Sequence, residues 1–354
     1  MTVTAPSAPA VASPVPPPLR EGRLRRWRRR VVVTTALALL LVALVATVLM
    51  TGNTFYPPSD VLRVLLGEQV QGASFTVGTL RIPRALIGAL AGIAFGLAGS
   101  TFQTMLRNPL ASPDIIGITS GASAAAVFSI LLLGWSSAAT SALALAVGVA
   151  TALVVYLSAR GGESTGGRLI LIGIGAGAMF DALVSYLLLR ADESDVSVAM
   201  RWLAGSLNNV RWQDLPALGV VVLVLGPLVL LLGRDLRALE LGDAAATSLG
   251  VRVDRARVLL VLSAVGLATF ATATTGPIAF VAFLAGPIAL RLVGPGGSVA
   301  LPAALTGGCL VLGADLLGQF AFDTKFPVGV ITGILGAPYL IYLLIRTNRV
   351  GGSS

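Results

Sequence analysis

The sequence predicts an all-α, polytopic membrane protein with about ten transmembrane helices. Hydrophobic residues make up 55% of its 354 residues and charged residues only 12%, and the mean hydropathy is +0.89. Ordinary soluble domains contain roughly 25% charged residues. Apolar stretches recur at the length of about 20 residues that a bilayer-spanning helix needs, and 41 glycines supply small side chains that let membrane helices pack closely. This composition excludes a soluble enzyme and a largely disordered chain.

The chain begins with a segment, 1–30, that is expected to be a disordered, basic cytoplasmic tail. Residues 1–19 are rich in Pro, Ala, Ser and Val without periodicity, as in segments that cannot bury enough surface to fold. Seven arginines between Arg20 and Arg30 directly precede the apolar stretch 31–50, and this order favours a first helix with a cytoplasmic N-terminus. A cleaved signal peptide is the alternative, but the stretch is longer than the usual apolar core and no clear cleavage site follows.

Ten apolar stretches form one predicted membrane domain, 31–347, and residues 348–354 form a short cytoplasmic tail. The predicted spans are 31–50, 82–105, 114–133, 136–158, 168–190, 214–233, 256–275, 277–293, 300–321 and 328–346. Their alternation places 18 of the 25 basic residues on the cytoplasmic side, which supports this register and puts both termini in the cytoplasm. The net charge of +9 therefore follows from membrane topology, and we expect the basic N-terminus to contact anionic lipid rather than nucleic acid.

The residue types that are missing narrow the chemistry. Without histidine, and with Cys309 as the only cysteine, the chain has no His/Cys metal site and no Cys-His nucleophile. Its only lysine, Lys325, follows Thr324, so the Gly-Lys-Ser/Thr motif of a phosphate-binding loop is absent. We therefore expect no catalytic residue and no bound cofactor in this chain, and any ATP would be used by a partner subunit.

Several ordered motifs within 31–347 carry a family resemblance. They include RIPR (81–84), RNPLASP (107–113), GPIAFV (276–281) and FPVGVIT (326–332). Together they resemble the FecCD family, the membrane permeases of ABC importers for iron(III)-siderophores, haem and vitamin B12. The resemblance implies a bundle like that of type II ABC importer permeases. It also implies a second permease subunit (a copy or a related chain), two ATP-binding subunits on the cytoplasmic side and an extracytoplasmic substrate-binding protein. A ferric siderophore is the first expected substrate, with haem and cobalamin as alternatives.

Two arginines mark the outer end of the second predicted span. Arg81 and Arg84 lie three residues apart, so they share one face of a helix. The resemblance implies that they dock acidic residues of the binding protein; the alternative is a pair of interfacial arginines that reach toward lipid headgroups. Relatives place a further docking arginine near the position of Gln319, and Lys325 is the candidate that replaces it.

A cytoplasmic stretch, 239–254, separates the sixth and seventh spans and reads as a short amphipathic helix ended by glycine. In the resembled family this stretch fits a groove in the ATPase, which implies a coupling role for Ala244, Ser248, Leu249 and Gly250. A plain surface loop is the alternative.

Polar residues in or beside the spans provide the remaining candidates. Gln103, Asn108 and Pro109 are candidates for the translocation path or gate, with helix packing and a simple turn as the alternatives. Asp181 and Asp315 lie within predicted spans, where a carboxylate is costly and usually has a partner. We expect structural hydrogen bonds for them. An ion-coupled secondary transporter would instead use both as carriers, but it would leave 239–254 unexplained, and no motif supports an intramembrane enzyme.

Overall fold

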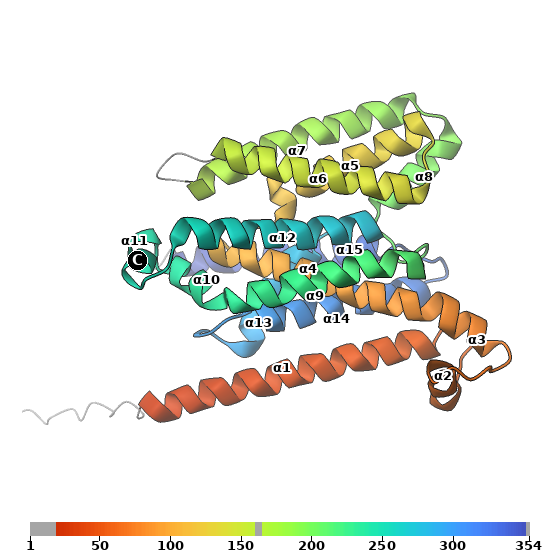
Figure 1. Ribbon diagram of the computed structural model, residues 1–354, viewed down its shortest axis with the longest axis horizontal. Coiled ribbons are helices and arrows are strands. Elements are labelled where there is room, and N and C mark those ends of the chain that lie inside the picture. Colours follow the sequence, from red (N-terminus) through yellow and green to blue (C-terminus); the bar gives the residue numbers. More distant parts are fainter. Residues whose placement is uncertain (1–18, 160–164, 352–354) are drawn as a thin grey trace, which may run out of the picture.

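The computed structural model describes residues 19–159 and 165–351, which form a bundle of helices without a strand in these two ranges (Figure 1). Seven helices in the described ranges are long and apolar enough to cross a membrane, and three shorter apolar helices accompany them. The long ones are α1 (Leu19–Met50), α4 (Ile82–Met105), α6 (Ser137–Ala159), α7 (Thr165–Arg190), α9 (Leu215–Leu231), α12 (Val253–Thr275) and α14 (Ala300–Phe320). The shorter apolar segments are Ile118–Leu133, which contains α5 (Ile118–Phe128), α13 (Val281–Val293), and Val328–Leu343, which is the apolar part of α15 (Val328–Gly351). Each falls on one of the ten predicted spans.

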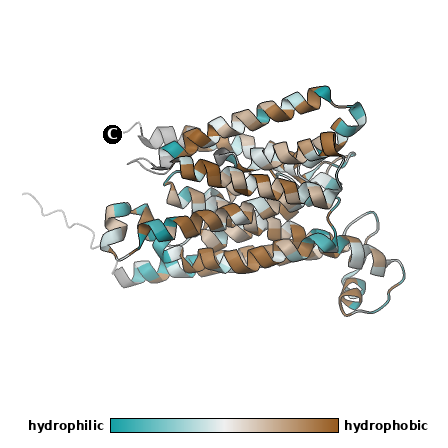
Figure 2. Ribbon diagram, turned by 45° about the horizontal axis from the view of Figure 1, so that its top comes forward, coloured by the Kyte–Doolittle hydropathy of each residue, from teal (hydrophilic) through white to brown (hydrophobic). Residues whose placement is uncertain are grey.

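The remaining elements lie at the two ends of the bundle. At one end, the α11 end, α10 (Gly233–Glu240) and α11 (Asp243–Ser248) connect α9 to α12. At the other end, the α8 end, lie α2 (Pro58–Leu65), α3 (Ala73–Phe75) and α8 (Glu193–Leu203). Figure 1 shows the α11 end on the left and the α8 end on the right, and α1 starts and α15 ends on the α11 side. Figure 2 shows hydrophobic residues along the long helices and hydrophilic residues gathered near their ends.

The central helix of the bundle is α4, which packs against α14, α12, α13 and α9. Its span, which begins upstream at Ala73 and includes the π-helical turn η1 (Thr76–Arg81), is 83% buried over its most apolar part. Glycines allow this close packing, because a Cβ atom on Gly92 would lie 2.4 Å from the carbonyl oxygen of Gly307. On another face of α4, a Cβ atom on Gly99 would lie 1.8 Å from the carbonyl oxygen of Ala282 in α13.

A second group of helices, α5 to α8, packs on one side of α12 and lies at the top of Figure 1. On the opposite side, α1 packs mainly along α14. In this chain only 11% of the apolar part of α7 and 17% of that of α1 is buried, so large apolar faces of both helices are open.

Both predicted tails are partly helical. The helix α1 begins at Leu19, so the arginine-rich part of segment 1–30 continues the first span as a helix. Arginine and leucine are good helix formers, and an existing helix extends at little cost. Similarly, α15 continues to Gly351, into the predicted tail 348–354. Residues 1–18 and 352–354 lie outside the described residues.

Candidate functional site

The segment between α9 and α12 presents the predicted coupling residues on the surface. Ala244, Ser248, Leu249 and Gly250 are all exposed, and Leu249 keeps 66% of its surface accessible. Glycines with positive φ bound α11: Gly242 has φ 107° and Gly250 has φ 83°, where side chains other than glycine's are disfavoured. Buried Ala246 fixes the inner side of α11. The helix is therefore held at its base and open on its outer side.

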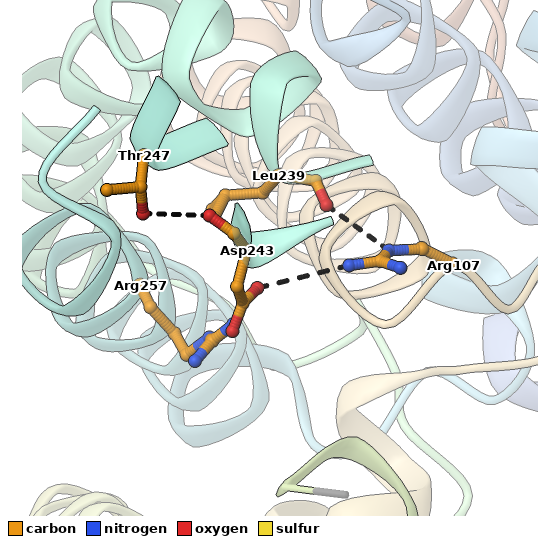
Figure 3. Close-up of polar contacts among 5 residues, drawn as sticks. All are labelled: Arg107, Leu239, Asp243, Thr247 and Arg257. Carbon is orange, nitrogen blue, oxygen red and sulfur yellow. Dashed lines mark hydrogen bonds and ion pairs between the residues drawn. The ribbon is translucent and has the colours of Figure 1, made fainter. Parts of the chain in front are cut away.

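Three charged side chains, which we call the Asp243 cluster (Arg107, Asp243 and Arg257), hold the start of α11 (Figure 3). Nη2 of Arg257 donates to both carboxylate oxygens of Asp243 at 2.8 and 2.9 Å. Nη2 of Arg107 lies 3.9 Å from the same carboxylate, and its Nε donates to the carbonyl of Leu239 at 3.2 Å. The cluster thus joins α4, the α10–α11 segment and α12.

The predicted gate residues lie beside this cluster but make structural contacts. Asn108 shapes the turn after α4, where its side-chain oxygen accepts a hydrogen bond from Leu110 N at 2.9 Å, and Pro109 follows it in the same turn. Gln103 is only 8% exposed and donates from Nε2 to the carbonyl of Phe283 at 2.9 Å. In this chain Gln103 is thus an α4–α13 contact, and its assignment to an open path is not supported.

At the α8 end, Arg81 does not present a free cation. Its side chain is 7% exposed and donates to the carbonyls of Leu49 at 2.9 Å and Thr54 at 2.6 Å, with its guanidinium 5.1 Å from the Tyr56 ring centre. Leu49 lies in the last turn of α1, where carbonyl groups have no partner within the helix. Arg81 supplies that missing donor, a role that its spacing from Arg84 did not reveal, and docking by Arg81 stays a prediction.

Arg84 is also engaged inside the bundle. It forms a two-pronged ion pair with Asp315 of α14, with distances of 2.8 Å from Nε and 2.6 Å from Nη2. Asp315 is 2% exposed, and Gln319 donates a further hydrogen bond to it at 2.8 Å. Asp315 therefore has the interhelical partner that a structural role requires, and Gln319 completes its coordination. This arrangement does not favour docking by Arg84.

Exposed cations at this end include Lys325, which donates to the side-chain oxygen of Asn53 at 3.3 Å, and Arg201. Both border a cavity of about 840 Å³ that Trp202, Asn208 and Asp195 also line. No local sequence pattern reveals this cavity, because its walls come from segments far apart in the chain. Asp181, in contrast, is exposed on the open face of α7.

These features define a class: a polytopic transport permease, with a tightly packed helical bundle, a short exposed helix at one end and a polar cavity at the other. The family model of the FecCD transport family matches residues 39–346, and the chain belongs to this family. It is 42% identical to the achromobactin transport system permease protein CbrC of Dickeya dadantii, covering 92% of this chain and 96% of the relative. It is 40% identical to the ferric enterobactin transport system permease protein FepG of Escherichia coli, covering 91% and 98%.

A chain of known structure has a similar fold. It comes from an inward-facing ABC transporter described as being of the metal-chelate type, with a TM-score of 0.79 and 27% identity, and the match covers 89% of this chain and 99% of that one.

Proposed function

We propose that this chain is the membrane permease subunit of an ABC importer for iron(III)-siderophores. A separate ATPase drives it, and an extracytoplasmic binding protein delivers the substrate. Relatives that transport achromobactin and ferric enterobactin support the substrate class. The observation that carries the ATP-driven role is the exposed helix α11, which ends in a surface leucine, Leu249, and is fixed to the bundle at its base. A short helix of this kind fits a groove on a partner.

This function orients the molecule. The α11 end faces the cytoplasm and two ATP-binding subunits, and the α8 end faces the binding protein. Both chain ends described by the structure lie at the α11 end, in agreement with the arginine distribution of the sequence. The chain holds no cofactor of its own, and ATP is hydrolysed on the partner. Lys325, beside the cavity at the α8 end, takes the docking role in place of Arg81 and Arg84.

The alternative of a proton- or sodium-driven carrier is not favoured. It would use Asp315 as a carrier, but this carboxylate is bound by Arg84 and Gln319. It would also leave the exposed α11 without a role. Haem and cobalamin are the alternative substrates for the same permease role, and the uptake experiment below tests them beside the siderophores.

Uptake measurements test the proposal. Iron-starved cells with and without the gene receive radiolabelled ferric siderophores, haem or cobalamin, and an ionophore collapses the ion gradients while ATP is maintained. We expect the deletion and a Leu249→Asp variant to lose uptake of a ferric siderophore, and the ionophore to have no effect. The control is Leu66→Asp, which replaces a leucine of 72% exposure at the α8 end and leaves uptake intact. Uptake that survives Leu249→Asp and vanishes with the gradient would contradict the proposal.

A further inference from the structure

Asp243 is the point at which two core helices contact the exposed helix α11. Arg257 lies near the start of α12 and donates to both oxygens of the carboxylate, while Arg107, two residues after the end of α4, approaches the same carboxylate from another side. Since Asp243 begins α11, any displacement of this helix moves the carboxylate relative to both guanidinium groups. The contact therefore ties the position of α11 to the positions of α4 and α12.

Arg107 also contacts α10. Its Nε donates to the carbonyl of Leu239, in the last turn of α10, where carbonyls lack helix partners. A Cβ atom on Gly242 would lie 3.8 Å from Nη2 of Arg107, so the guanidinium lies over the turn between α10 and α11. One side chain at the end of α4 thus contacts both short helices.

The backbone of Arg107 closes α4 in a Schellman motif. Arg107 N donates to the carbonyl of Thr104 at 3.2 Å, and Asn108 N donates to the carbonyl of Gln103 at 3.1 Å. This motif requires a left-handed residue after the helix, and Arg107 has a φ of 50° where glycine is the usual residue. The cap therefore fixes the point from which the Arg107 side chain reaches Leu239 and Asp243.

Gln103 connects the turn that carries Arg107 to the helix α13. One turn before Arg107, the backbone carbonyl of Gln103 accepts a hydrogen bond from Asn108 N, and its side chain binds the carbonyl of Phe283 in α13. The Asp243 cluster itself is half-exposed: Asp243 keeps 54% and Arg107 50% of its side-chain surface. Ion pairs this exposed contribute little to global stability. These ion pairs join three elements. We therefore expect them to affect the transmission of movement between these elements more than the free energy of unfolding.

We propose that Arg107 and Arg257 are positioning residues that hold Asp243, so that movement of α11 is transmitted to α4 and α12 and thereby to the transport path. This inference rests on the proposed function, in which an ATPase moves α11. The Asp243 cluster then converts the movement of α11 into a rearrangement of the core helices.

The test uses the complete transporter, with its ATPase and binding protein, reconstituted in liposomes. The readout is the number of siderophore molecules transported per ATP hydrolysed. In Asp243→Asn we expect ATP hydrolysis to stay within about twofold of the wild type, because an exposed ion pair is weak. We expect transport per ATP to fall about fivefold or more, as for the loss of a coupling free energy. Glu21→Gln is the matched control, since Glu21 is an exposed carboxylate in the first turn of α1, at the same end of the bundle but outside 239–254, and it leaves the ratio unchanged.

A double-mutant cycle shows whether the residues act together. Asp243→Asn and the double variant with Arg257→Gln are expected to lower the ratio to the same extent, and Arg257→Gln alone to lower it by no more, because Arg257→Gln breaks only a contact that Asp243→Asn already disrupts. Additive losses, or a wild-type ratio in Asp243→Asn, would overturn the proposal. So would loss of the ATPase subunit from purified Asp243→Asn, since Asp243 would then be a plain docking contact.

Hydrogen exchange on the assembled complex separates this inference from the proposed function. Amides of residues 243–250 are expected to exchange faster in Asp243→Asn than in the wild type and in Glu21→Gln. Unchanged exchange would show that Asp243 does not hold α11. A wild-type transporter that moves no ferric siderophore would contradict the proposed function, while the exchange comparison would still decide on the cluster.

Discussion

Arg84 and Asp315 show at the residue scale how a cation predicted for the surface can serve the interior. The carboxylate is 2% exposed, and the Arg84 side chain is 17% exposed, so removing Arg84 would leave a buried charge without its partner. We expect Arg84→Met to lower the free energy of unfolding by roughly 3–5 kcal/mol. The double variant Arg84→Met/Asp315→Leu should recover much of this loss. Thermal unfolding in detergent, followed by tryptophan fluorescence, measures both.

The control for this prediction is Lys325→Gln. Because Lys325 is exposed, its substitution should change stability by less than about 0.5 kcal/mol but weaken binding of the extracytoplasmic protein. If Arg84→Met unfolded like the wild type and lost only that binding, Arg84 would be a docking residue after all.

Arg81 and Arg84 also show what could not be predicted from the sequence alone. The spacing of Arg81 and Arg84 correctly placed both on one helix near the α8 end. The spacing could not indicate their hydrogen-bond partners, because only the packing of α1 and α14 brings Leu49, Thr54 and Asp315 to them. A lone arginine in a sequence looks the same whether it meets solvent or an unpaired carbonyl.

At the element scale, glycines set the distances between α4 and its neighbours. We expect Gly99→Ala to destabilise the protein by roughly 1–3 kcal/mol, the usual cost of overpacking. The added methyl group would lie 1.8 Å from the Ala282 carbonyl, so α13 has to move. Gly219→Ala in α9 is the control, since a Cβ atom there meets nothing within 4 Å and should be tolerated. Equal unfolding midpoints for the two variants would show that α4 and α13 separate easily.

The elements were predicted well where hydrophobic length alone decides them, since each of the ten apolar stretches corresponds to a helix. The arginine-rich segment was not, because composition predicted its charge but not its helical continuation of α1. Arg29 in this extension donates to the carbonyls of Arg291 and Leu292, at 2.9 Å each. It thereby supplies hydrogen-bond donors to carbonyls in the last turn of α13. That contact joins residues more than 260 positions apart, which no local pattern encodes.

At the scale of the whole molecule, the weakly buried helices α7 and α9 both expose large aliphatic residues, among them Leu189 on α7, but only α7 also exposes small residues around a carboxylate. Only 22% of the apolar part of α9 is buried, and its open face carries large aliphatic residues such as Leu223 and Leu231, which suit lipid. On α7 the open face includes Gly175, Ala178 and Ala182, together with Asp181. Small residues favour close contact with another helix, and a carboxylate in a span needs a partner or water. We therefore place the second permease subunit against α7.

Photo-crosslinking tests this placement. With p-benzoylphenylalanine in place of Ala182, we expect a product that contains a second permease subunit, and its mass tells a copy of this chain from a related one. The same residue in place of Leu223, which is 74% exposed on α9, should give only lipid adducts. Both positions are exposed in this chain, so a difference between them reports a protein neighbour. Lipid adducts alone at both positions would show that α7 faces the bilayer, and Asp181 would then have to be satisfied by water or by a headgroup.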